Sequence, residues 1–407
     1  MKAFTVAAAF FSLLLPPALP AQTLSGVLDS RMALSAGAGS APAFSWGFEE
    51  AANIRLQARV QDKAVFYGAV NLIAGAGSFA GASLAQAASA QALFGQAVPG
   101  QAASGQTLLP LSAFVAGENY AAALELERLY VRLRGEALGM DLGLMRIALG
   151  YGQIWGSSDF LNPRNPLSPH ARPRAALGGV FSLFPGGDIK LQAFAVSPQN
   201  PFALNGGGLV FGAAGENHWE RLSVQALYAY ELPRQGPPAG NASGLHRFGL
   251  SLKADAEAGL VADALLVWNP DRAFTIEGLS AGAGFDYSFL GGSCYVIAEY
   301  LFNGGDSSTA GIRRQGFEAN RNYLYALFRY RLDDYTSASL ACVASLDDLS
   351  FTPILAFDCD LFQGLSLSLS AQVPLDGSLF GAGGKGEMGP EAGGSYASLT
   401  SMLTLKF

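Results

Sequence analysis

Long stretches of this chain alternate apolar and polar residues with a period of two. In residues 321–332, Leu324 and Phe328 fall on the apolar even positions, while Arg329 falls on an odd position. Residues 335–346 repeat the pattern after a tight Asp-Asp turn. Such alternation is typical of β-strands with one apolar face and one polar face.

The same pattern predicts strands along most of the chain. The candidates are 23–34, 52–61, 64–74, 122–134, 138–149, 177–184, 188–197, 207–214, 218–231, 244–255, 258–269, 274–288, 291–302, 321–332, 335–346, 349–359, 362–373 and 395–407. Because the alternation in 207–214 is weak, the pattern leaves about 16 to 18 strands.

The connections between these strands alternate in length. Predicted short turns include Asp62-Lys63, Gly135-Glu136 and 215–217, and they all fall at one end of the strands. The long connections, 76–120 and 150–176 among them, all fall at the other end, where the only short ones are near 269–272 and at 347–348. Short periplasmic turns and long external loops are typical of outer-membrane β-barrels. The predicted fold class is therefore all-β, a transmembrane antiparallel β-barrel.

Composition agrees with a barrel in a membrane. Half of the residues are hydrophobic, only 14% are charged, and there are 50 glycines. After the N-terminal segment, no apolar run approaches the roughly 18 residues of a spanning helix. An apolar chain of this kind is either a large secreted β-protein or a barrel whose alternate residues face lipid.

The N-terminus has the pattern of a secretory signal peptide. Lys2 precedes about a dozen apolar residues, followed by prolines and small residues. We expect cleavage after Ala21, so that residues 1–21 are removed and residues 22–407 form the barrel in the bacterial outer membrane.

The last strand ends on an aromatic residue. Leu403, Leu405 and Phe407 share one face, which we expect to face lipid. This C-terminal pattern resembles the signal read by the barrel-assembly machinery, which implies that machinery as a partner during biogenesis. The alternative is an edge strand of a soluble sheet.

A hairpin predicted at Gly135-Glu136 carries a ladder of charges. If opposite residues have numbers that sum to about 271, Glu125 lies opposite Arg146 and forms an ion pair with it. The alternation slips above Arg128, which predicts a bulge. The expected lumen-facing charges are Arg128, Arg132, Arg134, Arg146, Glu125, Glu127 and Asp141. They either set selectivity or merely solvate a polar wall.

The segment after this hairpin is rich in glycine, proline, Asn and Asp. Arg146, Trp155-Gly156 and the run from Asp159 to Pro163 resemble a poorly characterised family of porin-like outer-membrane barrels. A departure from the family pattern is Gly143-Leu144-Met145 in place of Gly-Arg-Gln. By analogy with porins, loop 150–176 folds inward, with Trp155, Asp159, Asn162 and Arg164 as constriction candidates. The alternative is a proline-stiffened external cap.

Enzymatic chemistry finds little support in the sequence. Neither His218 nor His246 has an evident Ser or Asp partner, and no Gly-x-Ser-x-Gly, P-loop or metal-ligand cluster occurs. We expect no cofactor and no metal. The three cysteines cannot all pair, and the net charge of −7 offers no basic patch for nucleic acid.

The sequence thus predicts a porin-like channel for passive diffusion of small polar or ionic solutes, surrounded by outer-membrane lipid. A substrate-specific or hydrophobic-compound transporter, with loop 76–120 as a partial plug, is one alternative. A surface adhesion or structural barrel is another. The lipid-facing pattern does not distinguish a monomer from a homo-oligomer.

Overall fold

The computed structural model describes most of the chain. It covers residues 21–37, 44–61, 63–77, 112–117, 119–162, 166–167, 175–197, 209–233, 244–271, 276–304, 320–376, 386 and 395–407. Residues 1–20 of the predicted signal peptide, most of loop 76–120 and Arg164 lie outside these residues.

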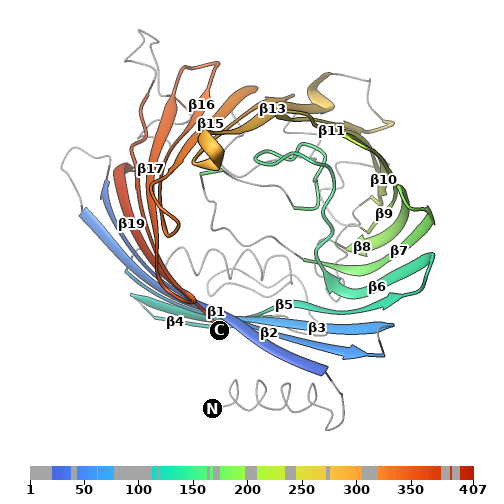
Figure 1. The fold of residues 1–407 in the computed structure, drawn as a ribbon, viewed down its shortest axis with the longest axis horizontal. Helices are drawn as coiled ribbons and strands as arrows, with labels where there is room; N and C mark the ends of the chain where they lie inside the picture. Colours follow the sequence, from blue (N-terminus) through green and yellow to red (C-terminus); the bar gives the residue numbers. More distant parts are fainter. Residues whose placement is uncertain are drawn as a thin grey trace.

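Within the described residues, 18 strands form one closed antiparallel barrel (Figure 1). They are β1 (Ala21–Gly37), β2 (Phe44–Val60), β3 (Ala64–Gly77), β5 (Tyr120–Arg134), β6 (Leu138–Met145), β7 (Ala176–Gly186), β8 (Ile189–Ser197), β9 (Val210–Trp219), β10 (Leu222–Glu231), β11 (Leu245–Asp255), β12 (Gly259–Trp268), β13 (Leu279–Phe289), β14 (Cys294–Asn303), β15 (Asn322–Arg331), β16 (Thr336–Ser345), β17 (Phe351–Phe362), β18 (Leu365–Gln372) and β19 (Ser395–Lys406). This confirms the predicted fold class and the upper end of the predicted strand number.

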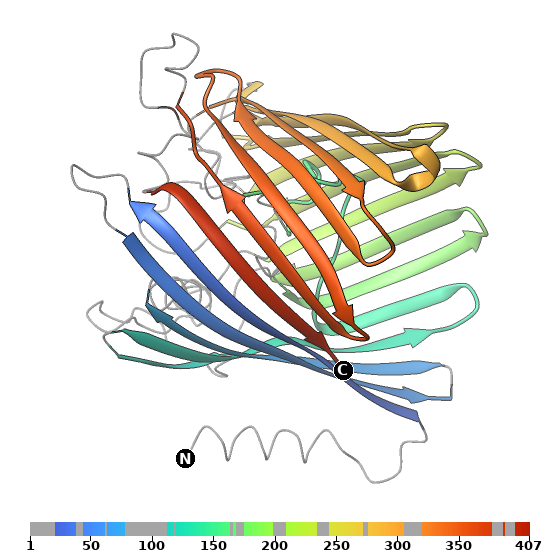
Figure 2. The same cartoon turned by 60° about the vertical axis from the view of Figure 1, so that its left-hand side comes forward.

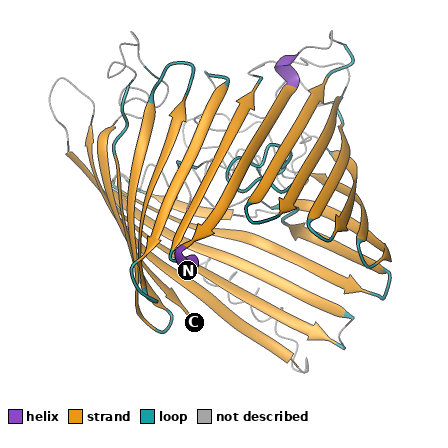
Figure 3. Cartoon of the chain, turned by 45° about the horizontal axis from the view of Figure 1, so that its top comes forward, coloured by secondary structure: helices purple, strands orange, loops and turns teal. Residues whose placement is uncertain are grey.

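Each of these strands pairs with its neighbour in sequence, apart from the pairing of β3 with β5 across β4. The strands are strongly tilted, as Figures 2 and 3 show. Tilt of this kind is required to close a sheet on itself. Among the described residues, no helix is both long enough and apolar enough to cross a membrane.

The seam between the first and last strands closes the barrel. Leu28 lies opposite Leu405 in the β1–β19 ladder. The N–H of Gly26 donates to the carbonyl of Phe407 at 2.8 Å, and the N–H of Phe407 donates to Gly26 at 3.1 Å. The Phe407 ring covers Gly26, where a Cβ would overlap it. The terminal aromatic residue therefore belongs to the seam.

A short strand, β4 (Ser112–Ala116), pairs only with β5 among the described strands. Its partners on β5 are residues 121–125, whereas β6 pairs with residues 129–134 on the same edge. β4 therefore occupies the edge of β5 beyond the point where β6 leaves the sheet. This strand lies within residues 76–120, which the sequence pattern predicts to be an external loop without a strand.

The two faces of the sheet have opposite polarity. On β11, Phe248 and Leu250 point outward and are 45% and 48% exposed, whereas Arg247 and Ser251 point inward and are 3% and 1% exposed. Apolar residues outside and polar residues inside are the arrangement that a barrel in lipid requires.

Strand connections also differ between the two ends. At the end that carries Phe407 they span two to four residues, whereas the connection between β6 and β7 spans 30. One predicted turn is wrong, because β9 continues through Glu216 and His218 to Trp219 and turns at Glu220-Arg221. The hydrogen-bonded ladder with β10 carries this strand past the predicted turn at 215–217.

Leu250→Arg places a charge on the outward face at the centre of β11. We expect it to lower the free energy of unfolding by about 2–4 kcal/mol, the cost of an arginine facing lipid near the midplane. Urea unfolding in lipid vesicles, followed by tryptophan fluorescence, measures this loss. The matched control is Ser370→Arg, which adds the same side chain to the inner face of β18. Equal losses from both variants would contradict the assignment of the faces.

Candidate functional site in the lumen

The chain leaves the sheet at Met145 and folds into the barrel (Figure 1). Residues 146–162, here called the inward loop, follow the inner wall. Gly150 and Gly156 adopt φ of +76° and +52°, a region that favours glycine. A Cβ at Gly152 would overlap the Asp263 carboxylate. The dense glycines thus permit the reversals and close approach of this loop.

Glu299 on β14 holds the middle of the inward loop. Its carboxylate accepts the backbone N–H groups of Gln153, Ile154 and Trp155 at 3.1, 3.0 and 2.8 Å. The Trp155 indole also donates to the Glu299 carbonyl at 2.9 Å. Three consecutive amides thus satisfy one carboxylate that is only 3% exposed. Buried charge is tolerated when it is hydrogen-bonded in this way.

Other wall residues hold the start of the loop. The N–H of Gly150 donates to the Gln225 side chain at 2.6 Å, and the N–H of Gly152 donates to Asp263 at 2.7 Å. The N–H of Tyr151 donates to the Ser251 hydroxyl at 2.8 Å. Neighbouring strands β10, β11 and β12 supply these three acceptors, so the loop crosses the strands of the wall.

Two apolar clusters on the inner wall also pack against the loop. Trp155 is fully buried and packs against Tyr323, with ring centroids 6.0 Å apart. Ile147, Leu149 and Leu161 join an inner cluster built on strands from β7 to β12. Apolar side chains on the inner face therefore bury this loop instead of lining water.

The structure describes three of the four constriction candidates, and they make different contacts. Asp159 accepts the N–H of Asn162 at 3.1 Å, and the Asn162 amide donates to the Ile147 carbonyl at 2.5 Å. Asp159 and Asn162 thus brace the loop internally, and Trp155 anchors it to the wall. Arg164 lies outside the described residues.

The charged hairpin has a register different from the predicted one. Arg132 lies opposite Asp141 and Arg134 lies opposite Gly139, so the numbers of paired residues sum to 273 and not to 271. The predicted ion pair between Glu125 and Arg146 is therefore wrong. Arg146 instead pairs with Glu127 at 2.6 Å. The turn is shifted by one residue, because the N–H of Gly135 donates to the carbonyl of Leu138 and residues 136 and 137 form its tip.

The predicted bulge is present, and Glu127 is its extra residue. Arg128 pairs with Ala69 and Leu126 pairs with Val70, which leaves Glu127 without a partner in the ladder. The bulge brings Arg128 within 3.2 Å of the Glu127 carboxylate, to which Arg146 also binds. Burial, and then the like charge of Arg128, lower the pKa of Arg146.

Further polar side chains surround this carboxylate. The Asn53 amide donates to Glu127, and the Arg55 guanidinium donates to Asn53. The group of Arg55, Arg128, Arg146, Asn53 and Glu127 is called the arginine cluster below. Its three cations exceed its one carboxylate, so it is a positive region of the inner wall.

Of the remaining ladder residues, Glu125 is linked to that cluster through Asn71, which accepts the Asn53 amide at 2.5 Å, whereas Arg132, Arg134 and Asp141 make separate contacts. Arg132 binds Asp141 through two nitrogens at 3.0 Å, so its charge is paired. Glu125 accepts the Asn71 amide at 3.1 Å. Arg134 lies over the Phe184 ring, 6.0 Å from its centroid. The seven predicted residues therefore do not form one continuous ladder.

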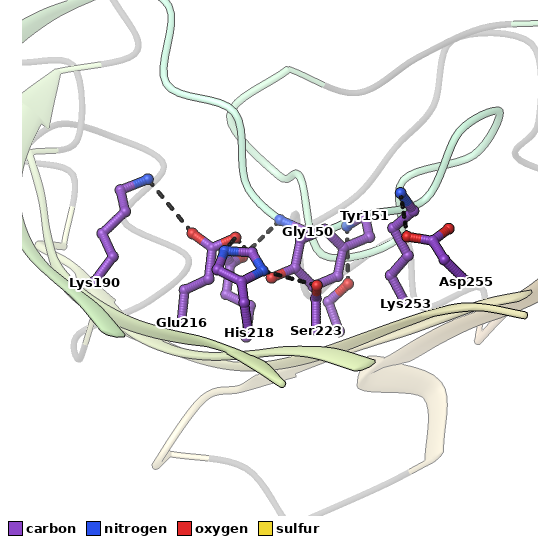
Figure 4. A network of polar contacts seen from close by, with 10 residues as sticks. Gly150, Tyr151, Lys190, Glu216, His218, Ser223, Lys253 and Asp255 are labelled. Atoms are coloured by element: carbon purple, nitrogen blue, oxygen red, sulfur yellow. Dashed lines mark hydrogen bonds and ion pairs between the residues drawn. The ribbon is translucent and has the colours of Figure 1, made fainter. Parts of the chain in front are cut away.

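A second polar group lies on β9 and β10 (Figure 4). The Ser223 hydroxyl is 2.8 Å from Nδ1 of His218, and Nε2 of His218 is 3.3 Å from the Glu216 carboxylate. The expectation that His218 has no serine or acid beside it is wrong, because the misplaced turn at 215–217 separates residues that the ladder brings together. The sequence indicates the longer strand through the polar residues Glu216 and His218, which continue the period of two as far as Trp219.

The inward loop contacts this group through Tyr151. The Tyr151 hydroxyl donates to Glu216 at 2.7 Å (Figure 4). Burial, and then this hydrogen bond, raise the pKa of the Tyr151 phenol, so the phenol remains a donor at neutral pH. Lys190 lies 3.5 Å from the other Glu216 oxygen.

Metal and disulfide chemistry is not seen in the described part of the chain. No group of three or more His, Cys, Asp or Glu side chains there is arranged to hold a metal ion. Cys294, Cys342 and Cys359 are free thiols.

Solved structures resemble this barrel over nearly its whole length. OccAB4 of Acinetobacter baumannii superposes with a TM-score of 0.55 at 9% identity, and opdK of Pseudomonas aeruginosa with 0.55 at 10%. In both comparisons the match covers 96% of this chain and 99% of the other. The fold is that of an outer-membrane porin.

A BenF-like porin from Pseudomonas fluorescens matches equally well, with a TM-score of 0.55 at 9% identity and coverage of 96% of this chain and 99% of that porin. No family model and no curated protein matches the sequence. The superpositions, and not the sequence identities, show the porin fold. The identity of the solute depends on the side chains of the lumen.

Glu299→Gln replaces one acceptor oxygen of the side chain by an NH2 group, which faces the backbone N–H donors of the inward loop. We expect it to destabilise the inward position of the loop by about 1–3 kcal/mol for each amide left unpaired. The loop should then leave the wall, with a changed single-channel conductance and faster proteolysis between residues 146 and 162. Glu136→Gln, an exposed turn residue, is the control. Unchanged current and unchanged proteolysis in Glu299→Gln would show that the carboxylate does not hold the loop.

Proposed function

We propose that this protein is a porin-like channel of the bacterial outer membrane for passive diffusion of small polar or ionic solutes. The observation that carries the proposal is the inward loop, which is fixed inside a closed 18-stranded barrel by hydrogen bonds to six strands of the wall, β9 to β14. Barrels of 16 to 18 strands are the size that leaves an aqueous channel, and a fixed inner loop narrows such a channel without filling it.

The charges of the lumen favour anions. The arginine cluster has three cations and one carboxylate, on β2, β5 and the start of the inward loop. On the opposite part of the wall, Asp263 and Glu299 accept loop amides, which screens their negative charge. Screened acids on that side and the excess of arginine in the arginine cluster make this cluster a region that attracts anionic solutes.

Transport without chemical conversion is the role that the fold supports best, since the structurally similar proteins are named as porins and outer-membrane proteins. In this proposal, the loop is held in place by Trp155, Asp159 and Asn162. Arg164 follows the inward loop in the sequence and stays a constriction candidate.

Export and assembly complete the proposal. We assign residues 1–21 to a cleaved signal peptide and residues 22–407 to the barrel. Leu403, Leu405 and Phe407 form the assembly signal, a role supported by the outward exposure of Leu403 and Phe407. Outer-membrane lipid surrounds the outward apolar face. The protein is either a monomer or a homo-oligomer in that membrane.

A substrate-specific transporter is the second candidate. The specific feature in its favour is the depth to which the inward loop is anchored, which makes a fixed binding surface inside the barrel. A surface adhesion role would depend on external loops that lie mainly outside the described residues.

Single-channel recording of refolded residues 22–407 in a planar bilayer tests the channel. We expect steady openings and a reversal potential that favours anions under a salt gradient. Arg128→Ala, which removes one cation from the arginine cluster, should lower the anion-to-cation permeability ratio by about twofold to fivefold, since one charge at about 4 Å in water contributes roughly 1 kcal/mol.

Arg221→Ala, in the exposed β9–β10 turn, removes the same charge away from the cluster and should leave the ratio unchanged. A folded barrel that passes no current would contradict the channel and favour the surface role. Saturation of the current by one class of solute would favour the transporter.

A further inference from the structure

The group of Glu216, His218 and Ser223 has an arrangement that solute passage does not need. Ser223 and His218 are direct cross-strand partners on β10 and β9. Their side chains meet on the inner face, with Oγ and Nδ1 2.8 Å apart (Figure 4). A neutral imidazole with Nδ1 unprotonated accepts the serine proton at that distance.

The other ring nitrogen faces a carboxylate. Glu216 lies two residues before His218 on the same strand, so both side chains point to the same face. Its Oε1 is 3.3 Å from Nε2 of His218. A carboxylate at this nitrogen fixes the tautomer in which Nε2 carries the proton and Nδ1 accepts one.

Glu216 is itself held in place. The Tyr151 hydroxyl donates to Oε1 at 2.7 Å, and Lys190 lies 3.5 Å from Oε2. The carboxylate side chain is only 14% exposed, whereas His218 is 50% exposed. A partly buried orienting acid and an accessible imidazole suit a reactive site, since the acid must stay fixed while the base meets a substrate.

Other serines and histidines of the described lumen and surface lack this combination. Ser368 donates to Asp358 at 2.6 Å, which is a serine and an acid with no imidazole. His246 is 2.8 Å from the Tyr228 hydroxyl, which is a histidine on the aromatic outer face. Of these three sites, only the site of Ser223 has a hydroxyl, an imidazole and a carboxylate in consecutive contact.

We propose that Ser223 is a nucleophile activated by His218, with Glu216 as the positioning residue, and that it takes an acyl group from small carboxylic esters in the lumen. The Ser223 oxygen attacks the ester carbonyl carbon while its proton moves to Nδ1 of His218. The carbon–oxygen bond to the alcohol then breaks, and the alcohol leaves with that proton. Water repeats the steps on the acyl-serine and releases the carboxylic acid.

The reaction is expected to be slow. β10 is paired on both edges, so its backbone N–H groups are used in the ladder and form no oxyanion hole beside Ser223. Losing one such donor typically costs about 10²–10³ in rate. Lys253, the cross-strand neighbour of Ser223 on β11, is a cation that could stabilise the oxyanion after releasing Asp255. Covalent capture of the serine is therefore a more sensitive readout than turnover.

The test uses the refolded mature protein and a fluorescent alkyl fluorophosphonate. The serine oxygen forms a bond to phosphorus, fluoride leaves, and His218 takes the proton. We expect one adduct, located at Ser223 by mass spectrometry and absent in Ser223→Ala. His218→Ala should slow labelling about 100-fold, the lower end of general-base catalysis. Glu216→Gln should slow it by about tenfold or more through the wrong tautomer.

Ser368→Ala, which removes a lumen serine beside an acid, is the matched control and should be labelled like the wild type. The heat-dependent gel mobility of each variant verifies that the barrel is folded. An adduct on any residue other than Ser223, or equal labelling of wild type and folded His218→Ala, would overturn the proposal. Because the readout is a covalent mass, a channel that conducts and a serine that is inert remain distinguishable.

Discussion

The need to pair every backbone N–H and C=O group that faces lipid determines this structure. A sheet satisfies that need only when its first and last strands meet, because an open edge in hydrocarbon costs several kcal/mol for each unpaired group. The seam of β1 with β19, which extends to the final residue through Gly26 and Phe407, provides this closure. Because lipid lies outside the closed wall and water inside it, apolar residues face outward and polar residues face inward.

Inside the barrel the same requirement is met by side chains. The inward loop has no neighbouring strand along most of its length, so Glu299, Asp263 and Gln225 accept its amides. Without these hydrogen bonds, the carboxylates of Glu299 and Asp263 would contribute their charge to the lumen. The loop and the wall therefore determine together where charge is available, and the arginine cluster and the group around His218 lie at the edges of this contact.

Alternation predicts much of the fold and little of its register. A period of two assigns each residue to a face, and a slip of two residues preserves that assignment. For this reason Arg132 faces inward in both the predicted and the observed pairing, yet the partner of Arg146 changes from Glu125 to Glu127. The Ser223–His218 contact was missed for a related reason, since it depends on the position of one turn. The anchors of the inward loop lie some 75 to 146 residues away in sequence, a separation at which no local pattern indicates a contact.

The short strand β4 makes two loops into one structural unit. When β6 turns inward at Met145, the upper edge of β5 loses its partner, and β4 takes the vacated place. The inward loop is therefore coupled to a strand that ends about 30 residues earlier in the chain. Shortening either segment during evolution would leave the other with an unmatched edge, so we expect their lengths to change together among related barrels.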